Sequence, residues 1–234
     1  GDAMTVLRLD IPELFWINTG VRQFNCSASG NAEEGFYVSE ITVTVKSKAD
    51  FARREGDLFA LYQRAKGEAL EEVSRYAATL EDADPRVAKL KAINHYLAEN
   101  TVYNKTDAFT DTPLGALVYG EALCEGYAGA FRALAQENGL TVVSVVGDSV
   151  SDGQHEKHMW SAALLDGKYY AIDATWNDTP GINEEEFFLV GNDTVYDVLR
   201  FSQSHLPDST LRTDHQWIVP AIQNTAYQPT ADAR

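Results

Sequence analysis

Three residues of the types that catalyse acyl transfer occur far apart in the chain, in the order cysteine, histidine, aspartate: Cys124, His158 and Asp173. A thiol is a poor nucleophile at neutral pH until its proton is removed, and a histidine held by a carboxylate is a suitable base. We therefore expect a cysteine nucleophile, a histidine general acid and base, and an aspartate that orients the imidazole. This expectation depends on elements that bring the three side chains together.

A helix is expected to begin at Leu123–Cys124 and to end at Asn138-Gly139, where glycine permits a left-handed cap. Its apolar side chains recur at steps of three and four residues: Tyr127, Phe131 and Leu134. The first turn of a helix stabilises a thiolate, because unpaired amides and the helix dipole favour negative charge there. The same position makes the backbone N–H of Cys124 a suitable donor to an oxyanion, and no second donor is assigned.

Four small residues follow the cysteine within this helix: Gly126, Ala128, Gly129 and Ala130. Two glycines are unfavourable in a helix on propensity alone, so a packing reason is needed. We expect these residues to let the helix approach a sheet closely.

Three strands are expected after this helix: Thr141–Gly147, His158–Leu165 and Lys168–Ala174. Asp166-Gly167 joins the last two and favours a two-residue hairpin turn. Such a turn sets Trp160 opposite Asp173, so that His158 and Asp173 are diagonal neighbours on one face, roughly 7–8 Å apart. A shift of one residue would place them on opposite faces. Trp160, on the face of the triad, is a candidate to line the substrate cleft, although such aromatics are more often core residues.

The whole chain divides into a strand-rich segment 1–50, a helical lead-in with the catalytic core 51–224, and a loose tail 225–234. In the first segment, Ile41–Val45 alternates with the period of a strand, and Ser29-Gly30-Asn31 is expected to form a turn between two strands. Two helices are expected next, one from Leu58 to Leu80 and one from Asp84-Pro85 to about Asn100.

Composition excludes several classes of protein. The 234 residues include 35 acidic and 19 basic ones, for a formal net charge of −16. Most of this surface would repel a phosphate backbone, so no nucleic-acid partner is expected. No apolar run is long enough to span a bilayer, and no transmembrane segment is expected.

The remaining cysteine and histidines carry weaker signals. Cys26, in a strand-like segment, is expected to be a buried thiol; a Cys26–Cys124 disulfide would remove the nucleophile. His155-Glu156-Lys157-His158 departs from the zinc motif His-Glu-x-x-His and has no further clustered ligands nearby, so no metal is predicted. The other histidines are expected to be structural or solvent-facing: His95, His205 and His215.

Short motifs around the three residues resemble the transglutaminase-like superfamily, and within it a bacterial branch of candidate cysteine peptidases. They are Cys124-Glu125-Gly126-Tyr127-Ala128, His158-Met159-Trp160 and Asp173-Ala174-Thr175-Trp176. Leu114–Leu117 and Ile93–Tyr103 are similar to the same branch, so that the resemblance covers roughly residues 86–178. Thr112-Pro113-Leu114 departs from the pattern of this branch, in which an aromatic residue often stands at this place. The sequence therefore does not assign the residues that form the wall of the cleft.

The resemblance implies an α+β fold in which the cysteine helix packs on an antiparallel sheet. It implies that Cys124, His158 and Asp173 act as nucleophile, general acid/base and orienting carboxylate in acyl transfer through a thioester, without a metal or an organic cofactor. The substrate would be a protein or peptide, with cell-wall or surface components as further partners.

The resemblance and the acidic charge favour an extracellular or cell-surface location, with a cytoplasmic one as the alternative. The first residues carry no signal peptide, but Gly1 resembles a cloning remnant, so a removed export or anchor segment stays open.

Three functions are compatible with the sequence. The first is a thiol hydrolase that cleaves peptide or isopeptide amide bonds. The second keeps the triad but transfers the acyl group to an amine, as a protein-glutamine transglutaminase, or acts as a deamidase on glutamine. The third is a non-catalytic cell-surface binding or structural module, against which an intact triad argues.

Overall fold

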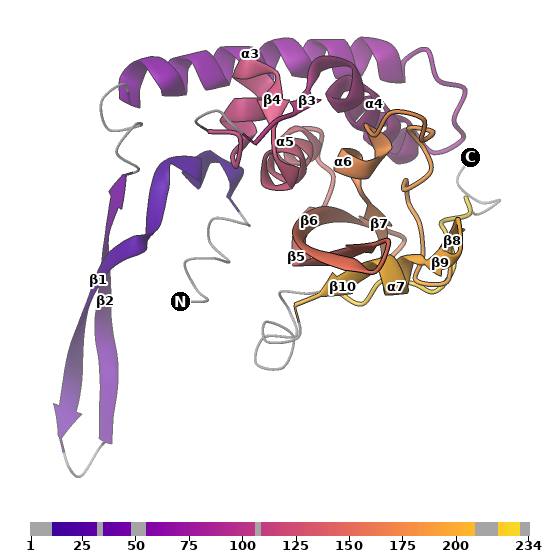
Figure 1. Cartoon of the computed structure of the whole chain (residues 1–234). Helices are drawn as coiled ribbons and strands as arrows, with labels where there is room; N and C mark the ends of the chain where they lie inside the picture. Colours follow the sequence, from indigo (N-terminus) through magenta and orange to yellow (C-terminus); the bar gives the residue numbers. More distant parts are fainter. Residues whose placement is uncertain (1–10, 32–34, 48–54, 106–108, 209–219, 230–234) are drawn as a thin grey trace.

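The structure is a computed structural model that describes residues 11–31, 35–47, 55–105, 109–208 and 220–229 (Figure 1). Its helices are η1 (Pro12–Trp16), α3 (Glu55–Ala77), α4 (Pro85–Asn100), η2 (Gly115–Tyr119), α5 (Cys124–Glu137), α6 (Ala174–Asn177) and α7 (Phe201–Ser204). Its strands are β1 (Ile17–Asn31), β2 (Gly35–Ser47), β3 (Val102–Tyr103), β4 (Glu121–Ala122), β5 (Val142–Ser151), β6 (Gln154–Leu165), β7 (Lys168–Ile172), β8 (Val195–Tyr196), β9 (Leu199–Arg200) and β10 (His205–Pro207).

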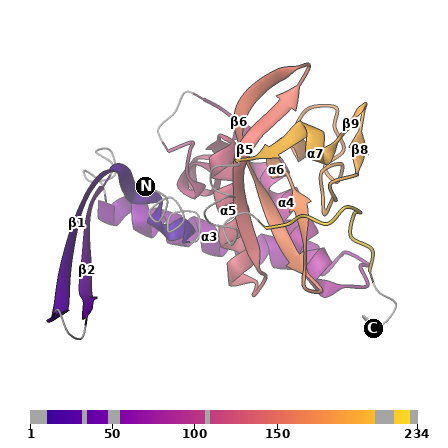
Figure 2. The same ribbon diagram turned by 90° about the horizontal axis from the view of Figure 1, so that it is seen from below.

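Four antiparallel strands in the order β10-β5-β6-β7 form the central sheet. The cysteine helix α5 lies between this sheet and the helices α3 and α4 (Figures 1 and 2). Fully buried side chains from all of these layers form one core: Tyr62 of α3, Ile93 of α4, Phe131 of α5 and Ile172 of β7. The α+β class and the packing of the cysteine helix on an antiparallel sheet are therefore confirmed.

The two helices that precede the site form as the sequence predicts. α3 buries one apolar stripe: Leu58, Tyr62, Ala69 and Val73. α4 begins at Pro85 because the side chain of Asp84 caps it, accepting a hydrogen bond of 2.9 Å from the backbone N–H of Arg86. No described helix combines the length and the apolar character that a bilayer crossing requires.

The hairpin of β6 and β7 has the predicted register. Leu165 pairs with Lys168, and Asp166 and Gly167 both have positive φ, 51° and 74°, as a type I′ turn requires. The strand β7 is shorter than predicted, because it ends at Ile172. Asp173 ends it by capping α6: its Oδ1 accepts hydrogen bonds from the next backbone amides, which turns the chain into a helix.

Strands β1 and β2 form a separate antiparallel hairpin that projects from the body (Figures 1 and 2). The turn predicted at Ser29-Gly30-Asn31 is wrong, since these residues pair with Tyr37, Phe36 and Gly35 and thereby satisfy their backbone groups across the ladder. The connection falls on residues 32–34, outside the described residues. Cys26 lies in β1, but its side chain is outside the described part, so its burial stays a prediction.

The sequence predicts a loose tail from residue 225, but Tyr227 anchors part of this tail to the fold. This side chain is 9% exposed, and its hydroxyl donates to Asp84 Oδ2 at 2.9 Å, while Asp166 Oδ2 lies 3.3 Å from the same oxygen. Its ring also packs edge-on against Tyr170, with 5.2 Å between centroids. Burial of an aromatic ring with a satisfied hydroxyl fixes this part of the tail over the β6–β7 turn.

Gly126 packs against a loop segment and not against the sheet, which corrects the prediction. A Cβ at this position would lie 2.5 Å from the carbonyl oxygen of Thr110 and 2.8 Å from the Cβ of Ala122. Ala128 belongs to a buried cluster with Met159 of the sheet. The absent side chain at Gly126 thus lets the segment before α5 lie directly on the helix that carries Cys124.

Replacing Gly126 by alanine is therefore expected to destabilise the fold by about 1–3 kcal/mol, because backbone atoms cannot move aside as a flexible side chain would. Gly67→Ala is the matched control, since a Cβ there meets nothing within 4 Å and alanine favours the helix α3 by roughly 0.5–1 kcal/mol. Urea unfolding of both variants measures the two free energies. Equal stability of both variants would contradict the close approach.

Candidate active site

Cys124 is the first residue of α5 and is a free thiol, 5% exposed, so a Cys26–Cys124 disulfide is excluded. Its side chain belongs to a small buried cluster with Ala128 and Met159, and its Sγ can donate to Glu125 Oε2 at 3.2 Å. Because a thiol proton turns freely about the Cβ–Sγ bond, the same sulfur can present it to another acceptor. The cysteine thus occupies the helix position expected for a nucleophile.

His158 lies on β6 and donates a hydrogen bond from Nε2 to Asp173 Oδ2 at 2.6 Å, with both side chains buried. This leaves Nδ1 for the thiol, and the Cys124 side chain lies close enough to hydrogen-bond the imidazole. Burial alone would lower the pKa of His158, but the charge and hydrogen bond of Asp173, together with Cys124, raise the pKa to about 10. The imidazole therefore carries a proton at neutral pH.

Asp173 has a fully buried carboxylate with four hydrogen-bond donors. Oδ1 accepts from the amides of Thr175 and Trp176 at 3.0 and 3.1 Å, and Oδ2 accepts from His158 and His205. Burial by itself would raise the pKa of this carboxyl, but the neighbouring imidazolium charge and these donors hold the pKa well below its usual range. The carboxylate is thus ionised, and its orientation is fixed on both oxygens.

His205 was expected to be structural or solvent-facing, and the structure places it in the site. It is the first residue of β10, 1% exposed, and its Nε2 lies 2.9 Å from Asp173 Oδ2. It follows Asp173 by 32 residues and belongs to no motif. Only the pairing of β10 with β5 brings it there, so no signal in the sequence could have found it.

Trp160 is almost entirely buried, with 1% of its surface exposed. Its ring stacks near His158, with 6.1 Å between centroids, and packs edge-on against His205 at 5.1 Å. Trp160 therefore has almost no exposed surface with which to make the predicted contact with substrate. Trp160 instead supports the two imidazoles from within the core.

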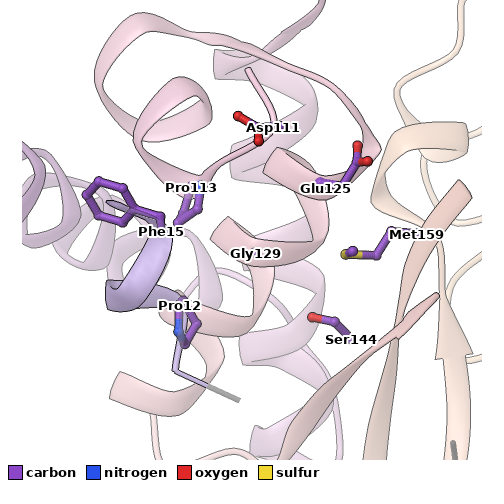
Figure 3. A pocket seen from close by; sticks show the side chains of 8 residues that line it. All are labelled: Pro12, Phe15, Asp111, Pro113, Glu125, Gly129, Ser144 and Met159. Atoms are coloured by element: carbon purple, nitrogen blue, oxygen red, sulfur yellow. The ribbon is translucent and has the colours of Figure 1, made fainter. Parts of the chain in front are cut away.

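A small pocket is lined in part by Glu125, the residue after Cys124 (Figure 3). Its lining comes from η1, the loop before η2, α5 and the sheet: Pro12, Phe15, Asp111, Pro113, Glu125, Gly129, Ser144 and Met159. Glu125 follows Cys124 in the chain and Met159 belongs to the same buried cluster as Cys124, so the pocket lies near the thiol. Pro113 belongs to the stretch in which the sequence departs from the family pattern. It forms part of the pocket wall, which the sequence did not assign.

Tyr103 flanks Cys124 on the N-terminal side of α5. It lies on β3, pairs with Ala122 just before the helix, and is 44% exposed. The pKa of Tyr103 is raised to about 12; burial is the largest cause, and the nearby Cys124 is the second. The phenol is therefore protonated at neutral pH and can donate a hydrogen bond at the mouth of the site.

The three clustered side chains His158, Asp173 and His205 offer ligand atoms within 4.8 Å of one another. Their nitrogens lie at hydrogen-bond distance from the carboxylate oxygen, and all three side chains are buried. These distances identify a hydrogen-bond network, and we do not assign the three residues as metal ligands.

Residues 74–174 match the family model described as the transglutaminase-like superfamily. This stretch contains Cys124, His158 and Asp173 and is similar to transglutaminase-like domains. The resemblance to the transglutaminase-like superfamily that the motifs indicated is thereby confirmed. The match supports an enzyme of the cysteine peptidase or transglutaminase type.

Individual proteins are more distant. The kyphoscoliosis peptidase of Mus musculus is 23% identical over 146 residues, which cover 56% of this chain and 22% of the mouse protein. Among solved structures, a TGase is 18% identical with a TM-score of 0.42 and covers 70% of this chain and 47% of its own. A cysteine protease candidate from Cytophaga hutchinsonii is 12% identical with a TM-score of 0.40 and covers 68% of each chain. This chain therefore spans about a fifth of the mouse peptidase and about half of the TGase.

The raised pKa of His158 predicts a defined dependence of stability on pH. Because the folded-state pKa of about 10 lies above the ordinary 6.5, the His158–Asp173 interaction stabilises the fold fully below pH 6.5 and is lost as the pH rises through 10. We expect His158→Gln to lower the melting temperature most near pH 6.5 and least above pH 10. His155→Gln, at an exposed histidine on the same strand, controls for the substitution. A deficit of equal size at both pH values would contradict the assignment.

Proposed function

We propose that this chain is a thiol hydrolase that cleaves peptide or isopeptide amide bonds through Cys124, His158 and Asp173. The observation that carries the proposal is the buried 2.6 Å hydrogen bond from His158 to Asp173, which leaves the other imidazole nitrogen to a free thiol at a helix start. Nucleophile, base and orienting group are thus linked in the order that thiol catalysis requires.

The first half of the reaction forms a thioester. Cys124 Sγ attacks the carbonyl carbon of the substrate amide as a thiolate, because its proton already lies on His158 Nδ1 before the attack. The oxyanion that forms lies near the start of α5, where the backbone N–H of Cys124 can donate to it. His158 then gives its proton to the departing nitrogen, the C–N bond breaks, and the amine leaves. Since His158 is protonated at neutral pH, this proton is in place before the bond breaks.

The second half releases the acyl group. A water molecule loses a proton to His158 as its oxygen attacks the thioester carbon. The C–S bond breaks, the carboxylic acid leaves, and the proton returns from His158 to the sulfur. The fixed carboxylate of Asp173 stabilises the imidazolium in both halves.

A digest of an unbiased peptide library, read by mass spectrometry, tests the proposal. We expect cleavage by the wild type, a loss of at least about 10³-fold in Cys124→Ala, and little change in Cys26→Ala, the matched cysteine control. Asp173→Asn keeps the shape but not the charge, and a loss of roughly 10²–10⁴-fold in kcat is expected. Cleavage that survives Cys124→Ala would rule the proposal out.

A parallel assay with glutamine-containing proteins and a labelled amine separates hydrolysis from amine transfer. Incorporation of label that depends on Cys124, without peptide cleavage, would identify a transglutaminase, and ammonia release alone a deamidase. A binding module would show none of these activities. Its thiol would also react with iodoacetamide only as the pH approaches the ordinary cysteine value of about 8.5.

A further inference from the structure

Two imidazoles share one oxygen of the triad carboxylate. Asp173 Oδ2 lies 2.6 Å from His158 Nε2 and 2.9 Å from His205 Nε2, while Oδ1 is taken by two backbone amides. Since an ionised carboxylate only accepts hydrogen bonds, both nitrogens must carry protons toward the same oxygen. His205 therefore competes with His158 for the negative charge of Oδ2.

The proton count around His205 leaves two forms of the ring, neutral and charged. Ser204 Oγ lies 2.9 Å from His205 Nδ1 and 3.2 Å from the carbonyl oxygen of Phe201, but a hydroxyl has one proton to donate. If it donates to Nδ1, His205 is neutral and its single proton is on Nε2, facing Asp173. The alternative, with Ser204 bonded to Phe201, requires a charged imidazolium.

The surroundings of His205 favour the neutral ring. Burial lowers the pKa of His205, the hydrogen bond and charge of Asp173 act in the opposite direction, and the charge on His158 lowers it further. Four aromatic rings surround it, at centroid distances of 4.0, 4.6, 5.1 and 5.9 Å: Phe201, Trp176, Trp160 and Phe187. Within so tight an enclosure the ring cannot turn away from the carboxylate.

We propose that His205 is a positioning residue of the active site, which as a neutral imidazole fixed by Ser204 holds Asp173 Oδ2 and takes part of its charge. His158 is then held by a carboxylate that is oriented but shared, and it releases its proton to the departing amine more readily. His205 itself, 1% exposed, does not touch substrate. This inference rests on the proposed thiol mechanism for its kinetic consequence but not for its effect on the imidazole.

Among the described residues, the titratable groups that act on the two imidazoles come from two elements besides their own. They are Asp173, at the start of α6, and Cys124, at the start of α5. Aromatic rings close much of the remaining space around His205. A change at His205 is therefore passed to His158 through Asp173.

Two variants separate the hydrogen bond from the packing. His205→Phe keeps a ring within the aromatic enclosure but removes the donor to Asp173. His205→Gln restores an amide donor at about the distance of Nε2. Because Oδ1 stays bound to the amides of Thr175 and Trp176, the carboxylate remains in place in His205→Phe, and Oδ2 interacts with His158 alone. The interaction of Oδ2 with the protonated imidazole of His158 must then become stronger.

The first measurement needs no activity: the imidazole signal of His158 is titrated by NMR in the Cys124→Ala background and is assigned by its absence in His158→Gln. We expect the midpoint to rise in His205→Phe and to return close to that of the parent in His205→Gln. An unchanged midpoint in His205→Phe, in a protein that melts cooperatively, would overturn the proposal.

The second measurement uses the active enzyme. We expect kcat to fall about 10-fold in His205→Phe with KM within about 2-fold, the alkaline limb of the pH profile to move upward, and His205→Gln to recover most of the rate. A lower melting temperature with unchanged kcat and limb would show a structural role only. If the wild type cleaves no amide, the proposed function fails, while the NMR titration still decides the role of His205.

Discussion

The site depends on the hydrogen bonds that the buried carboxylate of Asp173 accepts. An ionised group without solvent is costly unless it is fully paired, and here two amides and two imidazoles compensate its charge. The same side chain ends β7, caps α6 and orients His158. Local backbone geometry and the orientation of His158 are therefore set by one group, and a change in one of them alters the other.

A second set of contacts holds α5 against this carboxylate. Gly126 allows the segment before α5 to lie on the helix, and the hydroxyl of Tyr127 donates to Asp178, just after α6. A buried amide pair, Asn94 of α4 with Asn177 of α6, joins the helical layer to the same turn at 3.0 Å. The helix that carries the thiol and the turn that carries the carboxylate are thus fastened to common neighbours.

The stretch that matches the family model and the segments that flank it contribute different parts of the site. The stretch that matches the transglutaminase-like superfamily, residues 74–174, contains Cys124, His158 and Asp173. Segments outside it supply the surroundings: η1 contributes Pro12 and Phe15 to the pocket, and β10 contributes His205 to the carboxylate. These flanks act on the wall beside the thiol and on the charge of Asp173, which are features that can differ between proteins with the same core.

Local signals in the sequence determined the start of α4 at a capping aspartate, the type of turn at Asp166-Gly167, and hence the register that faces His158 toward Asp173. These features depend on neighbours in the chain, so they can be read from it. The tertiary structure alone decided that Gly126 faces Thr110 and that His205 reaches the carboxylate. It also decided that Trp160 is buried, because burial depends on segments distant in the chain whose packing no local pattern encodes.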